Sequence, residues 1–167
     1  MNFETRKGSF GPAADQYTRV LILGSLPGEE SLRRGQYYAH PRNQFWRLMG
    51  AVIGADLDAL AYPGRLAALQ AAGVGLWDVV RSAARKGSLD THIRDHEPNA
   101  LEALAAELPQ LRAVAFNGGT ALRLGRDLLN GVAGVTILAL PSSSPAHTLA
   151  FDRKLPAWMA LRPFLDR

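Results

Sequence analysis

One stretch of the chain is rich in side chains that could bind a planar ring. It runs from Gly24 to Trp46 and reads GSLPGEESLRRGQYYAHPRNQFW. Aromatic rings in its second half could stack on a flat ligand, and amide groups there could hydrogen-bond to the ligand's edge. The glycine–proline turn in its first half, GSLPG, follows an apolar run and could aim backbone N–H groups at the same ligand. The stretch therefore indicates a pocket for a planar molecule with a polar edge.

Several side chains of this stretch allow both a chemical and a structural interpretation. Asn43 could hold a water molecule or a base edge through its amide, or it could cap the helix that follows. His40 could act as a general acid or base, because imidazole exchanges protons near neutral pH, or it could be a polar loop residue. Phe45 could stack on a ligand or begin the core face of the next helix. Trp46 is expected in the core.

A second candidate segment, Pro141–His147, reads PSSSPAH and places three serines between two prolines. The prolines stiffen the backbone, and serine hydroxyl and backbone N–H groups suit contacts with phosphate. The candidate phosphate-contacting residues are Ser142, Ser143, Ser144 and His147. A surface turn built from residues that favour turns is the alternative.

Polar residues also stand at the ends of two further apolar runs. Asp78 lies inside LWDVV, where its carboxylate would face a pocket or tie down a neighbouring loop. Asn117 ends a run in FNGG, and asparagine before two glycines is first of all typical of a turn. Both residues are therefore candidates for the same site as the two loops.

These residues must be positioned by strands and helices that the apolar pattern predicts. Four runs without polar alternation predict strands buried on both faces: Arg19–Leu23, Gly73–Val80, Arg112–Phe116 and Val135–Leu140. Helical spacing predicts helices over 45–53, over Ala100–Leu108 with Asn99 as its cap, over Thr120–Leu129 and, interrupted by Pro156 and Pro163, over Asp152–Leu165.

Alternating strands and helices predict an α/β fold, a three-layer α/β/α domain with a central four-stranded parallel sheet. Ligands bind outside the carboxyl ends of such strands, where all the candidate residues fall. We expect one domain over residues 1–167, with Met1–Pro12 as a loose N-terminal arm.

Composition narrows the class of protein. Hydrophobic residues make up 47% of the chain, which is enough for a core, and the absence of cysteine excludes disulfides and thiolate metal sites. No apolar run is long enough to span a membrane, and the N-terminus lacks the pattern of a signal peptide, so we expect a cytoplasmic protein. The net charge of +4 permits a polyanionic partner. The basic residues that could form a positive rim, or be scattered surface charge, are Arg33, Arg34, Arg81, Arg85 and Lys86.

With these motifs, the sequence resembles the uracil-DNA glycosylase superfamily. GSLPG followed by SLRRGQYYAHPRNQFW resembles the mismatch-specific uracil/thymine enzymes, in which GINPG precedes P-G-N-R-F-W. LPSSSPAH and FNGG resemble the N/M-P-S-x-S loop and the FNGK segment of those enzymes. Leu26, however, stands where they have a catalytic asparagine. Together with YYAHPRNxFW and Ser88–Asp90, this leucine is most similar to the hypoxanthine-DNA glycosylase branch, in which the resemblance assigns catalysis to Asn43.

The resemblance implies a DNA-deoxyinosine glycosylase that flips a deaminated base out of DNA and hydrolyses its N-glycosidic bond without lyase activity. It implies no cofactor and no metal; DNA carrying a deaminated base is the partner, and a monomer is expected. Phe45 would stack on the purine, Asn43 would orient water, and Ser142 and Ser143 would grip phosphates. The full set of implied base-binding residues is Gly24, Ser25, Leu26, Tyr38, His40, Phe45, Asp78 and Asn117. A uracil/thymine mismatch enzyme and a non-catalytic nucleic-acid-binding domain are the alternatives.

Overall fold

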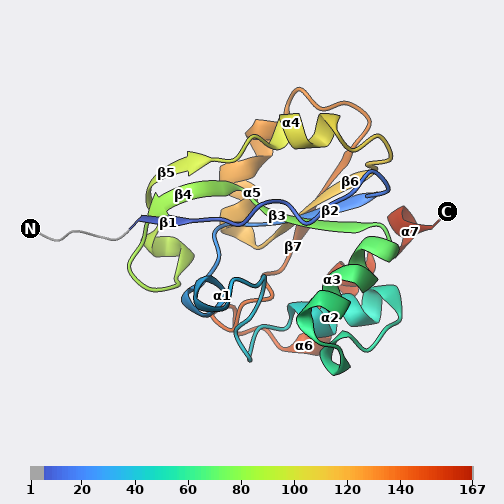
Figure 1. The fold of residues 1–167 in the computed structure, drawn as a ribbon, viewed down its shortest axis with the longest axis horizontal. Helices are drawn as coiled ribbons and strands as arrows, with labels where there is room; N and C mark the ends of the chain where they lie inside the picture. The colour runs from blue at the N-terminus through green and yellow to red at the C-terminus, as the bar shows by residue number, and fades with distance from the viewer. Residues whose placement is uncertain (1–5, 167) are drawn as a thin grey trace, which may run out of the picture.

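A parallel four-stranded sheet forms the centre of the molecule, as the computed structural model, which describes residues 6–166, shows (Figure 1). Its strands are β2 (Val20–Gly24), β3 (Val74–Asp78), β6 (Ala113–Asn117) and β7 (Thr136–Leu140), in the order β3-β2-β6-β7. Helices cover both faces, so the three-layer α/β/α architecture predicted from the sequence is confirmed. All four carboxyl ends lie at one edge of the sheet because every pairing is parallel.

The two faces of β2 explain why this strand shows no alternation of polar and apolar residues. Val20 and Ile22 pack into one hydrophobic cluster, whereas Leu21 and Leu23 pack into the other. All four side chains are completely buried, because successive side chains of a strand point to opposite faces and helices cover each face.

The helices divide into two layers. One face carries α2 (Phe45–Ile53), α3 (Tyr62–Ala71), α6 (Phe151–Met159) and α7 (Arg162–Leu165). The opposite face carries α4 (Leu101–Ala106), α5 (Gly119–Gly125) and the 3-10 turn η3 (Arg126–Leu129). The remaining short elements are α1 (Glu29–Arg34), η1 (Leu57–Ala59) and η2 (Asp90–His92). Within residues 6–166, no helix is both long and apolar enough to cross a membrane.

A second sheet of three antiparallel strands was not expected from the sequence. It consists of β1 (Arg6–Gly8), β4 (Val80–Ala84) and β5 (Arg94–Pro98), in the order β1-β4-β5. The single strand predicted over Gly73–Val80 therefore ends at Asp78, and its last residue begins β4. Residues 6–8 of the expected loose arm form β1, because backbone pairing with β4 holds them without any apolar pattern; residues 1–5 lie outside the described part of the chain.

Three helix predictions also need correction. Asn99 does not cap α4: Ala100 occupies the cap position, and the Asn99 amide donates hydrogen bonds to Asp78 O (2.7 Å) and Ser9 Oγ (2.9 Å). The helix predicted over Thr120–Leu129 changes to a 3-10 turn after α5. Helix α6 continues through Pro156, whose missing N–H removes one bond in the middle of the helix, and the break falls after it, between α6 and α7.

Candidate active site

A cavity of about 470 Å³ lies at the carboxyl ends of the parallel strands. Gly24, Asp78 and Asn117, the last residues of β2, β3 and β6, all line it. The glycine–proline turn after β2 and the serine loop after β7 line it as well. Segments far apart in the sequence meet here because a parallel sheet brings its carboxyl ends to one edge. The volume lies within the range of small-molecule sites.

Twelve of the thirteen site residues expected from the sequence line this cavity. They are Gly24, Ser25, Leu26, Tyr38, His40, Asn43, Asp78, Asn117, Ser142, Ser143, Ser144 and His147. The exception is Phe45, which is 0% exposed.

Phe45 cannot stack on a ligand as expected, because the ring of Tyr38 already covers one of its faces. The two ring centroids are 3.9 Å apart and the planes differ by 19°. Trp46 and Trp158 approach Phe45 edge to face. Phe45 thus lies beneath Tyr38, and Tyr38 borders the cavity together with Tyr37.

Tyr38 is held in place by two contacts, in spite of an unfavourable backbone conformation. Its backbone has a φ of +53°, a left-handed conformation that a tyrosine adopts at a cost and that the surrounding structure must stabilise. The Trp46 indole N–H donates to its carbonyl oxygen (3.1 Å), and Phe45 packs against its ring. Its hydroxyl oxygen is buried and has no hydrogen-bond partner among residues 6–166. Burial and the charge of nearby Asp78 raise the pKa of Tyr38.

Asn43 is not the cap of α2, because Gln44 occupies that position, but its side chain contacts both the start of the helix and the cavity. Its Oδ1 accepts a hydrogen bond from Phe45 N–H (3.0 Å), which satisfies a donor at the start of α2. The same side chain lines the cavity. The amide nitrogen, and the second lone pair of Oδ1, are therefore the polar groups that Asn43 can offer to a ligand or a water molecule.

His40 is oriented by its own loop. Its Nδ1 accepts a hydrogen bond from Arg42 N–H (3.1 Å), and its backbone carbonyl accepts one from Asn43 N–H (2.9 Å). A ring nitrogen that accepts leaves the proton of the neutral imidazole on Nε2. His40 can thus present an N–H donor at the cavity, which it lines.

Asp78 and Tyr38 converge above Gly24 on the floor of the cavity. A Cβ atom on residue 24 would lie 2.7 Å from Asp78 Oδ1 and 3.2 Å from Tyr38 Oη, so glycine leaves room for both. Asp78 is 4% exposed, and its Oδ2 has no hydrogen-bond partner among the described residues. Burial is the largest cause that raises its pKa to about 7; the charge of Asp90 adds to the rise and that of Arg85 opposes it.

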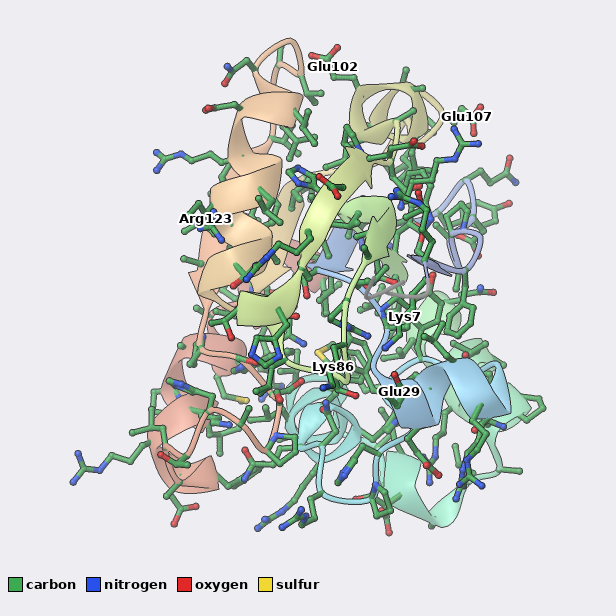
Figure 2. The ribbon with its side chains drawn as sticks, turned by 90° about the vertical axis from the view of Figure 1, so that its left-hand side faces the viewer. Lys7, Glu29, Lys86, Glu102, Glu107 and Arg123 are labelled. Carbon is green, nitrogen blue, oxygen red and sulfur yellow. The ribbon has the colours of Figure 1, made fainter. Side chains whose placement is uncertain are left out.

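The turn after β2 is fixed by a loop that the sequence analysis noted only as part of a resemblance. Ser25 Oγ donates to Asp90 Oδ1 (2.6 Å), and Ser88 Oγ accepts from Glu29 N–H (2.8 Å). Figure 2 shows Lys7 of β1 beside Glu29 of α1, with which it forms an ion pair, and Lys86 close by. The small antiparallel sheet therefore connects directly to the cavity wall.

Arg85 is the residue of this loop that sequence reasoning placed wrongly. It is 1% exposed, so it does not belong to a positive surface rim. Its guanidinium donates to the carbonyl oxygens of Leu26 (3.4 Å), Pro27 and Gly87 (2.8 Å). A planar guanidinium with five N–H groups can bind several carbonyls at once, which a lone arginine in a sequence does not reveal.

The serine loop is tied to β6 by a reciprocal pair of hydrogen bonds. Asn117 Nδ2 donates to Ser143 Oγ and Ser143 N–H donates to Asn117 Oδ1, each at 2.9 Å. Asn117 is thus more than a turn residue. Ser143 is 1% exposed, so the expectation that its hydroxyl grips a phosphate is wrong for this structure: that hydroxyl organises the loop. Gly118, with a φ of +101°, makes the turn beside Ser142.

Two residues of α6 anchor the serine loop from behind, and the sequence analysis did not single out either. The Trp158 indole N–H donates to Pro141 O (3.0 Å), and Lys154 Nζ lies 3.5 Å from Ser144 O. Lys154 is buried, which lowers its pKa. The serine-loop residues that remain accessible are the half-buried Ser142 and Ser144 and the exposed His147.

Comparison with known proteins gives the class to which this fold and site belong. The family model described as the uracil DNA glycosylase superfamily matches residues 12–164. The chain belongs to this superfamily.

Individual relatives are similar over most of the chain. A hypoxanthine DNA glycosylase of Methanosarcina barkeri is 49% identical over 113 residues, which is 68% of this chain and 72% of that protein. A hypoxanthine DNA glycosylase of Methanosarcina acetivorans is 41% identical over 155 residues, 93% of this chain and 97% of that protein. A solution NMR structure from Methanosarcina acetivorans, named as a candidate uracil DNA glycosylase, has a TM-score of 0.87 at 40% identity and covers 98% of this chain and 100% of that one.

Proposed function

We propose that this protein is a DNA glycosylase that flips a deaminated base out of DNA and releases hypoxanthine from deoxyinosine. The superfamily membership and the names of the two Methanosarcina relatives support this activity. The observation that carries the proposal is the single cavity in which an aromatic ring, an amide side chain and the serine loop come together. An enzyme that acts on a base inside a duplex needs such a pocket to receive the extruded nucleotide.

The flipped purine would lie between Tyr38 and the turn after β2. The Tyr38 ring, rather than Phe45, would stack on the base. The carbonyls of Gly24 and Ser25 accept from Val79 and Val80 N–H groups, which fixes the turn, and the N–H groups of the turn would address the base. Asp78 and the Asn43 amide would contact its polar edge. Stacking and edge contacts of this kind hold a flipped base.

Hydrolysis would then proceed by attack of water on C1′. Asn43 would orient the water, using the amide groups that remain after Oδ1 accepts from Phe45 N–H. Cleavage of the N-glycosidic bond builds positive charge on the sugar, as in glycoside hydrolysis. Neighbouring DNA phosphates would stabilise that charge.

We expect hydrolysis without lyase activity, cofactor or metal. Lyase activity needs an amine that can form a covalent intermediate with C1′. Among the described residues that line the cavity there is no lysine, and Lys154 is buried behind the serine loop. Ser142, Ser144 and His147 would contact the DNA backbone next to the flipped nucleotide.

Two further expectations concern the molecule as a whole. We expect the protein to act as a monomer, and sedimentation of the protein alone would measure this. A DNA substrate is the reason to place the protein in the cytoplasm.

Excision from defined oligonucleotides tests the proposal. Duplexes carrying inosine, uracil, xanthine or a G·T pair are incubated with the protein, and abasic sites are then cleaved with alkali. We expect cleavage at inosine. Cleavage at uracil without cleavage at inosine would instead identify a uracil enzyme. Salt-dependent binding without release of any base would identify a non-catalytic DNA-binding domain.

A further inference from the structure

Asp78 is a carboxylic acid at the wall of the cavity, and the hydrolysis described above uses it only for contact with the base. The carboxyl group is buried at the end of β3, it lines the cavity, and Oδ2 has no partner among residues 6–166. A buried polar atom without a partner costs free energy, so such groups are kept where a ligand completes them. A hydrogen-bonding group of the bound base would therefore complete the contacts of the Asp78 carboxyl group.

The chemistry of a purine substrate gives this carboxyl group a second use. A purine leaves C1′ with the electron pair of the C1′–N9 bond, and the five-membered ring accepts that pair more readily when N7 carries a proton. A neutral carboxylic acid can supply this proton, whereas an amide can only donate a hydrogen bond. Asp78 can thus transfer a proton to the base, which asparagine at the same position could not do.

We infer that Asp78 is a general acid that protonates N7 of the flipped hypoxanthine as the glycosidic bond breaks. The inference rests on the proposed function. The proton passes from the Asp78 carboxyl group to N7, and the C1′–N9 electron pair moves into the purine ring. Hypoxanthine leaves as a neutral molecule. The water at Asn43 adds to C1′ and loses a proton to solvent, and the Asp78 carboxylate regains a proton from solvent.

The surroundings of Asp78 keep the required proton available near neutral pH. The charged or titratable groups that face it are Asp90 of η2, Arg85 beyond β4, and Tyr37 and Tyr38 of the loop before α2. Burial and Asp90 favour the neutral acid, Arg85 favours the carboxylate, and the pKa of about 7 reflects that balance. His40, His147, Glu29 and Glu30 also line the cavity.

The decisive experiment compares Asp78→Asn with the wild-type protein on two substrates. One duplex carries inosine and the other carries 7-deazainosine, whose ring has carbon at position 7 and cannot accept the proton. Single-turnover base release is measured on both sides of neutral pH. Binding to a non-cleavable 2′-fluoro-inosine duplex verifies that the variant is folded and still takes up the base.

We expect the wild-type rate on inosine to fall as the pH rises through about 7, where Asp78 loses its proton. Asp78→Asn should bind the 2′-fluoro duplex but release hypoxanthine about 10²–10⁴-fold more slowly. Its rate should not fall as the pH rises through about 7, so the alkaline limb of the wild-type pH profile should be absent. On 7-deazainosine the wild-type rate should drop to that of the variant.

Three results would overturn the inference. They are an unchanged rate in Asp78→Asn, equal wild-type rates on the two substrates, and a slow variant that keeps the alkaline limb of the wild type, since the last would mean that Asp78 only contacts the base. A wild-type protein that releases no hypoxanthine would instead contradict the proposed function, so the two failures are distinguishable.

Discussion

Asn43 shows how one side chain meets a structural and a chemical demand with different atoms. Its Oδ1 accepts from the Phe45 N–H group at the start of α2, while the amide nitrogen is left for the cavity. The helix begins directly after the loop that carries Asn43, so the same hydrogen bond that satisfies the helix donor also orients the amide. Aspartate can replace the accepting oxygen but not the N–H donors, which allows the two roles to be separated.

We predict that Asn43→Ala and Asn43→Asp differ in stability but not in their loss of activity. Asn43→Ala should lose about 1 kcal/mol of unfolding free energy because the accepting oxygen is removed, and Asn43→Asp should lose only a few tenths. Both should release hypoxanthine at least about 10²-fold more slowly. Urea unfolding and single-turnover excision measure the two effects. Wild-type turnover in Asn43→Asp would show that Asn43 has only a structural role at the start of α2.

At the scale of elements, the small antiparallel sheet positions the cavity wall formed by the turn after β2. Arg85, which follows β4, donates to the carbonyls of Leu26 and Pro27, and Asp90 of η2 accepts from Ser25. The carbonyl groups of the turn are thereby occupied by protein donors. A turn whose carbonyls are bound in this way can keep its N–H groups directed to a ligand without reorganisation.

We predict that Arg85→Met destabilises the protein by about 2–4 kcal/mol, because buried carbonyls lose their donor. Hypoxanthine release should slow more than DNA binding weakens, since Arg85 acts on the turn and not on the DNA backbone. Arg85→Lys is the matched control, because lysine keeps the charge but cannot bind several carbonyls in one plane. Its stability and its excision rate should lie between those of the wild type and those of Arg85→Met. Excision rates, DNA titrations and urea unfolding measure these changes. Equal losses of binding and excision would argue against a positioning role.

At the scale of the whole molecule, the cavity contains buried polar groups and a backbone conformation that cost folding free energy. Asp78 Oδ2 and Tyr38 Oη are buried without hydrogen-bond partners among residues 6–166, and Tyr38 has a left-handed backbone. The surrounding core, with Trp46, Phe45 and Trp158 packed around Tyr38 and beneath it, offsets this cost. Such local costs are typical of sites that are complete only when a ligand is bound.

We predict that this burial makes stability depend on pH. The folded protein raises the pKa of Asp78 from 3.8 to about 7, so folding binds the proton. The contribution of Asp78 is therefore full below pH 3.8, falls as the pH rises to about 7 and is constant above it. The loss is of the order of 4 kcal/mol. Asp90, whose pKa is also raised, acts in the same direction.

Urea unfolding at several pH values measures this dependence, with Asp78→Asn as the control. The wild type should lose stability relative to the variant between pH 5 and about pH 7, because only the wild type ionises Asp78. Parallel stability curves for the two proteins would show that Asp78 keeps an ordinary pKa in the folded state.

Local patterns in the sequence were sufficient to place the strands of the central sheet and most of the cavity lining, although the edge strand β7, expected to be buried on both faces, is largely exposed. Strands such as β2 are apolar throughout because both faces are covered, and this is visible in five consecutive residues. The short strand β1 was not foreseeable, since Arg6–Gly8 has no apolar pattern and depends on pairing with β4. The roles of Arg85 and Asn99 were missed for the same reason, because their partners are distant in the sequence.

The sequence by itself determined the α/β architecture, the edge of the sheet where ligands bind and the polar residues gathered there. Each of these follows from periodicity and from the order of strands, which are properties of neighbouring residues. The tertiary structure decided that Tyr38 faces the cavity while Phe45 lies beneath it, that Ser143 is buried against Asn117, and that Asp78 lacks a partner. Those outcomes depend on which side chains from separate elements occupy the same space, and spacing along the chain does not specify that.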